Sequence, residues 1–227
     1  MTKKMKFIGS EIFEYEVFKI RDIYDPILKQ VSPIFDFSSP PIDPKFLANS
    51  LMETMVHHYG IGLAAPQCGL LYRAFSMGGN KTGAICFNPE ILSTEGEDYF
   101  EEGCLSASGL FLKIKRPTII KVRYSEFSGV VKEETFTGLT AKIFAHELDH
   151  LNGVVFTSLV NTFHLDRAKK KVKRNLKLLA AQREKADTDR LVQERVDTVI
   201  AQVTARAKEK ATSALIHDIP DDLSIKM

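Results

Sequence analysis

The chain has 227 residues, a net charge of +2 and a hydrophobic content of 44%. These values are typical of a globular protein and exclude a disordered, collagenous or low-complexity chain. The longest uncharged stretch, residues 151–165, contains polar residues and is shorter than the roughly 18 apolar residues that a membrane span needs. Three cysteines at irregular spacings indicate no disulfide framework. We therefore expect a cytoplasmic protein without a membrane segment.

Residues 1–20 show no clear structural pattern and are interpreted as an N-terminal extension. Asp43 followed by Pro44 is typical of the start of a helix, and apolar residues at helical spacing predict that this helix continues to about Gly60. Short runs rich in β-branched and aromatic residues then predict antiparallel strands. These runs are residues 72–77, 84–92, 110–114, 118–127 and 131–139.

The rest of the chain is predicted to be helical. One helix is expected from Thr140 to the Asn-Gly pair at 152–153, because Gly is common just after a helix end. Another helical region begins near His164, and apolar residues between 191 and 207 recur at the spacing of an amphipathic helix of roughly 20 residues. The last dozen residues are interpreted as a tail. Residues 165–185 carry nine basic and two acidic side chains, a density that attracts phosphate groups but that also suits a merely solvated helix face.

The strongest chemical signal is the pair His146 and His150, with Glu147 directly after the first histidine. Residues four apart share one helix face, so both imidazoles can bind one metal ion. Glu147 can then act as general base toward a metal-bound water. Unrelated surface histidines could show the same spacing, but the chain has only six histidines and the Glu stands at the required place.

A catalytic metal site needs a third protein ligand. The metzincin pattern would require a histidine where the chain has Phe156, and the first downstream glutamate, Glu184, lies in the basic segment. Cys104 lies in an acidic loop that contains Gly, and its thiolate is a good soft ligand beside two imidazoles. Cys68 and Cys86 are expected to be small buried hydrophobic residues.

Residues 60–67 form a third segment of interest, with the sequence GIGLAAPQ. Its glycines let backbone approach a ligand closely, and Gln67 offers an amide donor. The segment does not fit a phosphate loop, because no Lys follows the glycines. Alone it is a weak signal, since a Gly-rich turn after a helix is usually only a turn.

Together the segments GIGLAAPQ (60–67), EGCLS (102–106) and HELDH (146–150) resemble the three motifs of the peptide deformylase family, in the same order. The resemblance covers about residues 21–165. It departs at Ser108, where the family often has Pro, and at Ala145, where Gln is common. It implies an α+β fold with antiparallel β-sheets packed around a central metal-binding helix. Residues 1–20 would be an N-terminal extension, 21–165 the catalytic domain and 166–227 a charged helical C-terminal extension.

The resemblance also implies an activity: a metal-dependent hydrolase that removes the N-formyl group from the formylmethionine of nascent polypeptides and releases formate. By this resemblance the metal ligands are Cys104, His146 and His150, and the ion is Fe²⁺, for which Zn²⁺, Ni²⁺ or Co²⁺ can substitute. The catalytic groups are Glu147 as general base, with the Leu105 backbone N–H and the Gln67 amide holding the oxyanion. The residues that bind the substrate are Gly60, Ile61, Gly62 and Gly103.

The implied partners are formylated nascent peptides and, through the basic residues 167–185, the ribosome, but neither DNA nor a membrane. Two alternatives remain. A zinc endopeptidase is disfavoured by the missing third His or Glu, and a non-catalytic relative that only binds ribosomes is disfavoured by the intact Glu147 and Gln67. We further predict that an ion pair between Asp149 and Arg116 braces the metal-binding helix, the alternative being a solvated Asp149.

Overall fold

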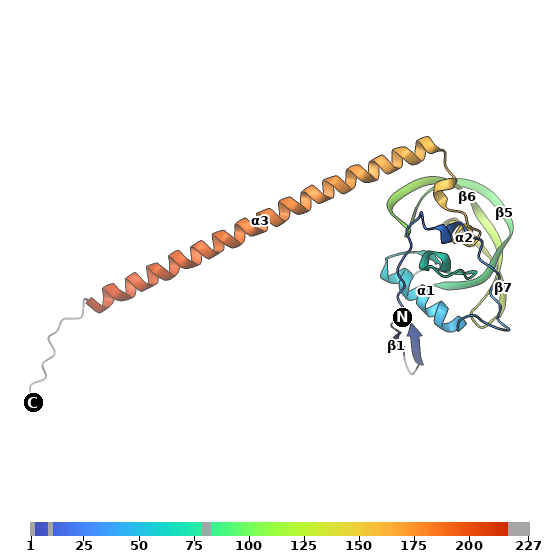
Figure 1. Ribbon diagram of the computed structural model, residues 1–227, viewed down its shortest axis with the longest axis horizontal. Coiled ribbons are helices and arrows are strands. Elements are labelled where there is room, and N and C mark those ends of the chain that lie inside the picture. The colour runs from blue at the N-terminus through green and yellow to red at the C-terminus, as the bar shows by residue number, and fades with distance from the viewer. Residues whose placement is uncertain (1–2, 9–10, 79–82, 218–227) are drawn as a thin grey trace, which may run out of the picture. The chain divides into compact units, whose positions relative to one another are not determined.

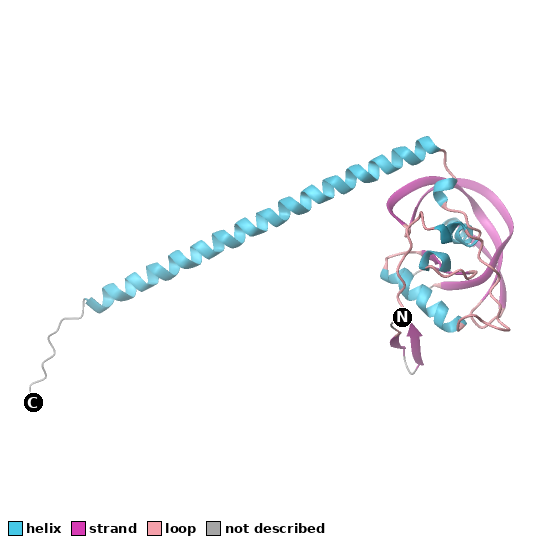
Figure 2. Ribbon diagram, in the orientation of Figure 1, coloured by secondary structure: helices cyan, strands magenta, loops and turns pink. Residues whose placement is uncertain are grey.

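The computed structural model describes residues 3–8, 11–78 and 83–217, and the chain divides into two units, Met1–Val172 and Lys173–Met227. Figures 1 and 2 show strands and short helices in the first unit. Its helices are α1 (Pro44–His57) and α2 (Gly138–Leu151), together with short 3₁₀ turns. Its strands are β1 (Lys4–Ile8), β2 (Glu11–Tyr15), β3 (Gly62–Ala64), β4 (Ala74–Met77), β5 (Ala84–Cys104), β6 (Ala107–Ser125) and β7 (Val131–Thr137).

The main sheet has five antiparallel strands in the order β3-β4-β5-β6-β7. In Figure 1, β5 and β6 bend around α2, which lies inside the curve of the sheet. Phe144 and Leu151 of α2 are fully buried in one core cluster with Phe75 and Ile120 of the sheet. The sequence prediction of an α+β fold, with antiparallel strands around a central helix and a helical C-terminal extension, is confirmed.

The first helix also begins as expected. The Asp43 side chain accepts a hydrogen bond from the Lys45 backbone N–H, and Pro44 occupies the first turn. Leu47 and Leu51 of α1 are fully buried in a second core cluster. This cluster fixes the chain segment that leaves α1 and enters β3 at Gly62.

The two longest strands differ from the sequence prediction. β5 continues through residues 93–104, which are mostly exposed and acidic and therefore lack the alternating pattern of a half-buried strand. β6 is one strand through Pro117, where the sequence indicated two separate runs. Proline is tolerated at a sheet edge, and β7 pairs with β6 only from Ile119 onward. This part of β5 is held in the sheet by pairing with β6, whose Leu110, Leu112 and Ile114 are buried in a core cluster.

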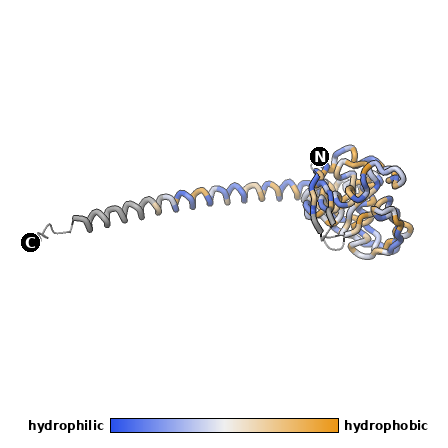
Figure 3. The backbone as a smooth tube through the Cα atoms, turned by 90° about the horizontal axis from the view of Figure 1, so that it is seen from below, coloured by the Kyte–Doolittle hydropathy of each residue, from blue (hydrophilic) through white to orange (hydrophobic). Residues whose placement is uncertain are grey.

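The ends of the chain are more regular than the sequence indicated. Residues 4–15, which showed no pattern, contain the antiparallel pair β1–β2. A single helix α3 (Thr162–His217) replaces the two predicted helical regions. The predicted apolar stripe can be followed as far as Val196, where its side chains are exposed, and Figure 3 shows these apolar positions scattered among hydrophilic ones. The predicted tail lies, from residue 218, outside the described residues.

The start of α3 belongs to the first unit. Leu165, Ala168 and Val172 recur at helical spacing and pack on a core cluster that includes Leu112 and Phe156. Across the described residues, no helix is both long and apolar enough to cross a membrane.

This packing predicts where the chain can be shortened. A chain that ends at Val172 should unfold at the same temperature as the first unit of the full protein. A chain that ends at Leu165 loses the burial of Ala168 and Val172, about 1–2 kcal/mol, which lowers the melting temperature by roughly 2–8 °C. Thermal unfolding followed by circular dichroism measures the difference. Equal melting temperatures for the two chains would show that residues 166–172 do not stabilise the domain.

Candidate metal centre

One face of α2 carries the two histidines of the site. His146 and His150 lie one turn apart with ring centroids 5.0 Å from each other, and both are buried, at 8% and 1% exposure. The helix packs inside the curve of the sheet, and both imidazoles contact residues of β5, His150 with Cys104 and His146 with Glu102. Their spacing on one helix face is the geometry that the sequence predicted.

Cys104 reaches the histidines from the end of β5. It pairs with Ala107 across a two-residue turn, Leu105 and Ser106, and the register between β5 and β6 shifts next to it. Such irregularities re-aim side chains beside functional sites. The Cys104 Sγ lies 3.3 Å from His150 Nε2. One ligand atom from each of Cys104, His146 and His150 lies within 4.8 Å of the others.

Gln67 is held beside this cluster by its own loop. Its Oε1 accepts a hydrogen bond of 2.8 Å from the Ala64 N–H, which turns the amide NH₂ toward the site. The Nε2 donates to Cys104 Sγ at 3.3 Å and to Ser106 Oγ at 3.2 Å. The loop that begins at Gly60 and the turn after Cys104 are therefore joined through one buried amide.

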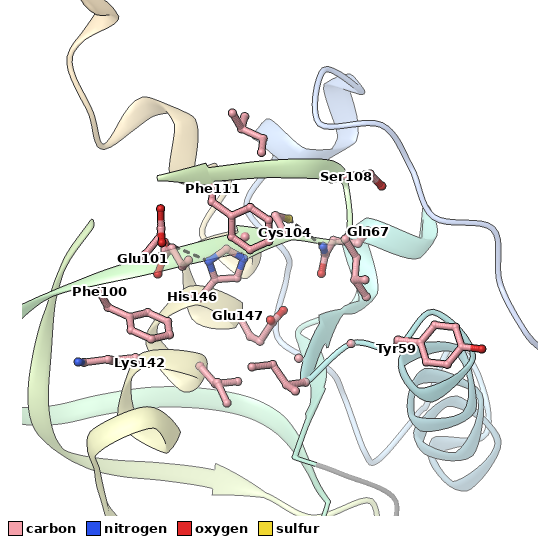
Figure 4. Close-up of a pocket in the computed structure, with 18 of the residues that line it drawn as sticks. Tyr59, Gln67, Phe100, Glu101, Cys104, Ser108, Phe111, Lys142, His146 and Glu147 are labelled. Atoms are coloured by element: carbon pink, nitrogen blue, oxygen red, sulfur yellow. Dashed lines mark hydrogen bonds and ion pairs between the residues drawn. The ribbon is translucent and has the colours of Figure 1, made fainter. Parts of the chain in front are cut away.

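Glu147 points into the same space (Figure 4). It is 3% exposed, and its Oε2 has no hydrogen-bond partner among the described residues. Burial raises the pKa of this carboxyl group to about 7. A Cβ atom at Gly62 would overlap the Glu147 carboxylate, so only glycine lets the loop pass this close to it.

Behind the ligands lies a buried ion network. The predicted pair is confirmed: Arg116 Nη1 donates to Asp149 Oδ2 at 2.6 Å. The same guanidinium binds both oxygens of Glu102, at 2.7 and 3.0 Å, and Glu102 Oε1 lies 3.3 Å from His146 Nδ1. Although burial favours its neutral form, the hydrogen bonds to His146 and Arg116 lower the pKa of Glu102.

Sequence reasoning missed the role of Glu102. A usable signal was present, because side chains two apart on a strand share one face and Glu102 precedes Cys104 by two residues. Ser106, which accepts from Gln67, was also missed as a site residue. Cys68 and Cys86 are buried and free, as predicted.

The three candidate ligands fit a divalent metal ion. A thiolate with two imidazoles is a donor set for Zn²⁺ or Fe²⁺. The ligand imidazole must be neutral, and burial lowers the pKa of His150 well below its usual value. A metal-binding histidine commonly donates its other ring N–H to a carboxylate, and Glu102 stands in that position for His146.

Cys104, His146 and Glu147 stand in the wall of a pocket of about 550 Å³. Every residue that the resemblance assigned to substrate binding lines it, as does Leu105. The apolar walls include Phe100 and Phe111 from the two long strands and Ile143 from α2. Figure 4 shows Phe111 over the site and Tyr59 at the opposite end from Lys142. The four lining residues that the resemblance assigned to substrate binding are Gly60, Ile61, Gly62 and Gly103.

Comparisons with known proteins agree with this geometry. The model of the family described as polypeptide deformylase matches residues 17–166. A peptide deformylase of Thermotoga maritima is 39% identical over 147 residues, which are 64% of this chain and 88% of that protein. A peptide deformylase of Caldanaerobacter subterraneus is 41% identical over 145 residues, 63% of this chain and 89% of that protein. The crystal structure of a peptide deformylase from Legionella pneumophila has a TM-score of 0.64 and 33% identity, covering 73% of this chain and 98% of that one.

The ion network predicts an effect on metal binding. Glu102→Gln removes the negative charge that holds Arg116 and leaves one acceptor oxygen where Glu102 offers two, so Arg116 and His146 can no longer both be bound as before. We therefore expect the metal dissociation constant to rise by about 10–100-fold. Competition with a coloured chelator measures it. Glu97→Gln is the matched control, because Glu97 lies on the same strand but pairs with Lys115 at the surface. An unchanged dissociation constant in Glu102→Gln would contradict the assigned role.

Proposed function

The chain belongs to the polypeptide deformylase family, and from this premise we propose that it hydrolyses the N-formyl group of peptides that begin with formylmethionine. It is a peptide deformylase, a hydrolase with a metal site. Water adds to the formyl carbon, the C–N bond breaks, and formate and a free amine leave. The observation that carries the proposal is the buried Glu147 carboxylate, whose Oε2 has no hydrogen-bond partner among the described residues, beside the Cys104, His146 and His150 cluster at an apolar pocket.

Cys104, His146 and His150 would hold the ion, which we propose is Fe²⁺, with Zn²⁺, Ni²⁺ or Co²⁺ as substitutes. The thiolate favours a softer ion than a carboxylate ligand would. When bound, the ion supplies a Lewis acid that lowers the pKa of water and polarises the formyl oxygen.

Glu147 would serve as the proton carrier. Its Oε2 has no partner among the described residues, so a water can donate to it without displacing another group. A general base works best with a pKa close to the operating pH, and burial brings the Glu147 pKa to about 7. The carboxylate takes the proton from the attacking water and delivers it to the leaving amine.

The negative charge that develops on the formyl oxygen needs hydrogen-bond donors. We assign these to the Leu105 backbone N–H in the turn after Cys104 and to the Gln67 amide, whose orientation is fixed by Ala64. Removing one donor of this kind costs about 10²–10³-fold in kcat. The Gly60 to Gly62 backbone and Gly103 would line the path of the peptide. At Gly103 a Cβ atom would lie 2.9 Å from the Phe111 ring.

Further support for a peptide substrate comes from a relative. A peptide deformylase of Acinetobacter baumannii, 28% identical with a TM-score of 0.60, has a structure with Met-Ala-Ser bound. The three cysteines of this chain are free, which supports the proposed location in the reducing cytoplasm.

The central catalytic prediction concerns Glu147. Glu147→Gln keeps the size of the side chain but cannot accept the proton, so formate release from formyl-Met-Ala-Ser should fall about 10²–10⁴-fold. The bound metal, measured by elemental analysis, should stay at the level of the original protein. Full activity in the variant would contradict the role of Glu147. Cleavage of casein by the original protein would instead favour the endopeptidase alternative.

We also propose that the basic residues 167–185 bind the ribosome. This segment lies within α3 and carries nine basic and two acidic side chains. Lys173, Arg174 and Lys177 are exposed, so their charges are available to phosphate groups. Docking would raise the local concentration of formylated chains without changing the chemistry.

Co-sedimentation tests this binding. A triple variant reverses three of these charges: Lys173→Glu, Arg174→Glu and Lys177→Glu. It should not sediment with ribosomes at low salt. Added salt should weaken ribosome binding by the original protein. Arg190→Glu with Arg195→Glu serves as the control, because these residues lie on the same helix outside the basic segment. Turnover of a free formyl tripeptide should not change in either variant. Undiminished sedimentation of the triple variant would refute the proposal.

A further inference from the structure

Lys142 is an unexpected residue in the wall of the pocket. It lies on α2, four residues before His146, and therefore shares the helix face that carries the histidines. Its neighbours in the pocket are apolar, with Ile143 beside it and the Phe100 ring 5.0 Å from its Nζ. Figure 4 shows the ammonium group below Phe100, pointing away from Glu147. The apolar end of the pocket is thus closed by a cation.

The ammonium group is incompletely satisfied. An ammonium has three N–H donors, but among the described residues Lys142 makes one hydrogen bond, of 3.5 Å, to Asp98. Asp98 is 63% exposed, while the Lys142 side chain is 12% exposed. A contact of that length to a solvated carboxylate is weak. Donors of Lys142 remain available to a ligand that enters the pocket.

The position of Lys142 matches the first side chain of the proposed substrate. This step rests on the proposed function, which places the formyl group at Glu147 and the metal ligands. Lys142 precedes His146 by four residues, so its backbone lies about 6 Å from that of His146 along the axis of α2, within reach of a methionine-length side chain that extends from the metal ligands. The other end of the pocket opens at Tyr59, which is 96% exposed. The first side chain would therefore run between Phe100 and Ile143 toward the Lys142 ammonium.

From this placement we propose that Lys142 is a specificity-determining residue. It lets the pocket accept a first side chain of methionine length that ends in a neutral oxygen acceptor, in addition to methionine itself. Methionine sulfoxide has this chemistry and arises by oxidation of methionine. Glutamine carries its oxygen at the corresponding position and is the practical probe. Norleucine has the same length but no acceptor. The reaction is unchanged, since only the side chain of the formylated residue differs.

The test compares formyl-Gln-Ala-Ser with formyl-norleucine-Ala-Ser. A hydrogen bond from a charged donor favours the acceptor side chain by at least about tenfold, so Lys142→Met should lower the Gln-to-norleucine ratio of kcat/KM by that factor or more. Lys115→Met is the matched control, because Lys115 is an exposed lysine on β6 paired with Glu97, and its ratio should equal that of the original protein. An unchanged ratio in Lys142→Met overturns the proposal.

Two further measurements keep the result decisive. Calorimetric binding of both peptides to metal-loaded Glu147→Gln protein, with and without Lys142→Met, gives the same ratio without turnover, so it judges Lys142 even if no formate is released. If Lys142→Met does not fold, the proposal is tested by comparing the turnover of the two peptides by the original protein. Formyl-Gln turnover comparable to that of formyl-norleucine is expected, and a preference for norleucine of more than about 100-fold, the upper range for one charged hydrogen bond, refutes the role of Lys142. Failure of all formyl peptides, formyl-Met included, refutes the proposed function instead.

Discussion

The site depends on one buried cation, the guanidinium of Arg116. It is 6% exposed and lies between Glu102 of β5 and Asp149 of α2, so it ties the sheet to the helix at the level of the metal ligands. Burying such charges costs several kcal/mol for each ion. A buried ion group of this kind is therefore poorly explained by stability alone, whereas its contact with His146 through Glu102 gives it a positioning role. Removing Arg116 would leave the carboxylates of Glu102 and Asp149 without their shared cation next to the ligands.

The rest of the centre follows from this brace. With α2 fixed against the sheet, the helix presents two imidazoles and Glu147 on adjoining faces, and the irregular end of β5 brings Cys104 to them. Gln67 then joins the glycine loop to the turn after Cys104. The pocket is bounded by the same elements, so the groups proposed to bind the metal, move the proton and recognise the side chain are all held by one helix, one hairpin and one loop.

The sequence predicted the α+β fold and the clustering of the candidate metal ligands, but not the extent of the long strands. His146, Glu147 and His150 could be assigned because helical spacing fixes which residues share a face, and the Asp149–Arg116 pair followed from opposite charges on a helix and a neighbouring strand. The length of β5 could not be predicted, since its acidic residues 93–104 are held by pairing with β6 and bury little apolar surface. Pro117 concealed the continuity of β6, because proline disfavours the interior of a strand and is tolerated here where β7 does not yet pair with β6. Glu102 was missed because its partners, Arg116 and His146, come from two other elements of the chain.

The claim that Cys104, His146 and His150 together hold the ion is tested most directly by X-ray absorption at the metal edge of the loaded protein. The account predicts one sulfur at about 2.3 Å and two nitrogens at about 2.0–2.1 Å if the ion is Zn²⁺. The sulfur signal should disappear in Cys104→Ser. A coordination shell without sulfur in the original protein, or a sulfur signal that survives in Cys104→Ser, would contradict the account.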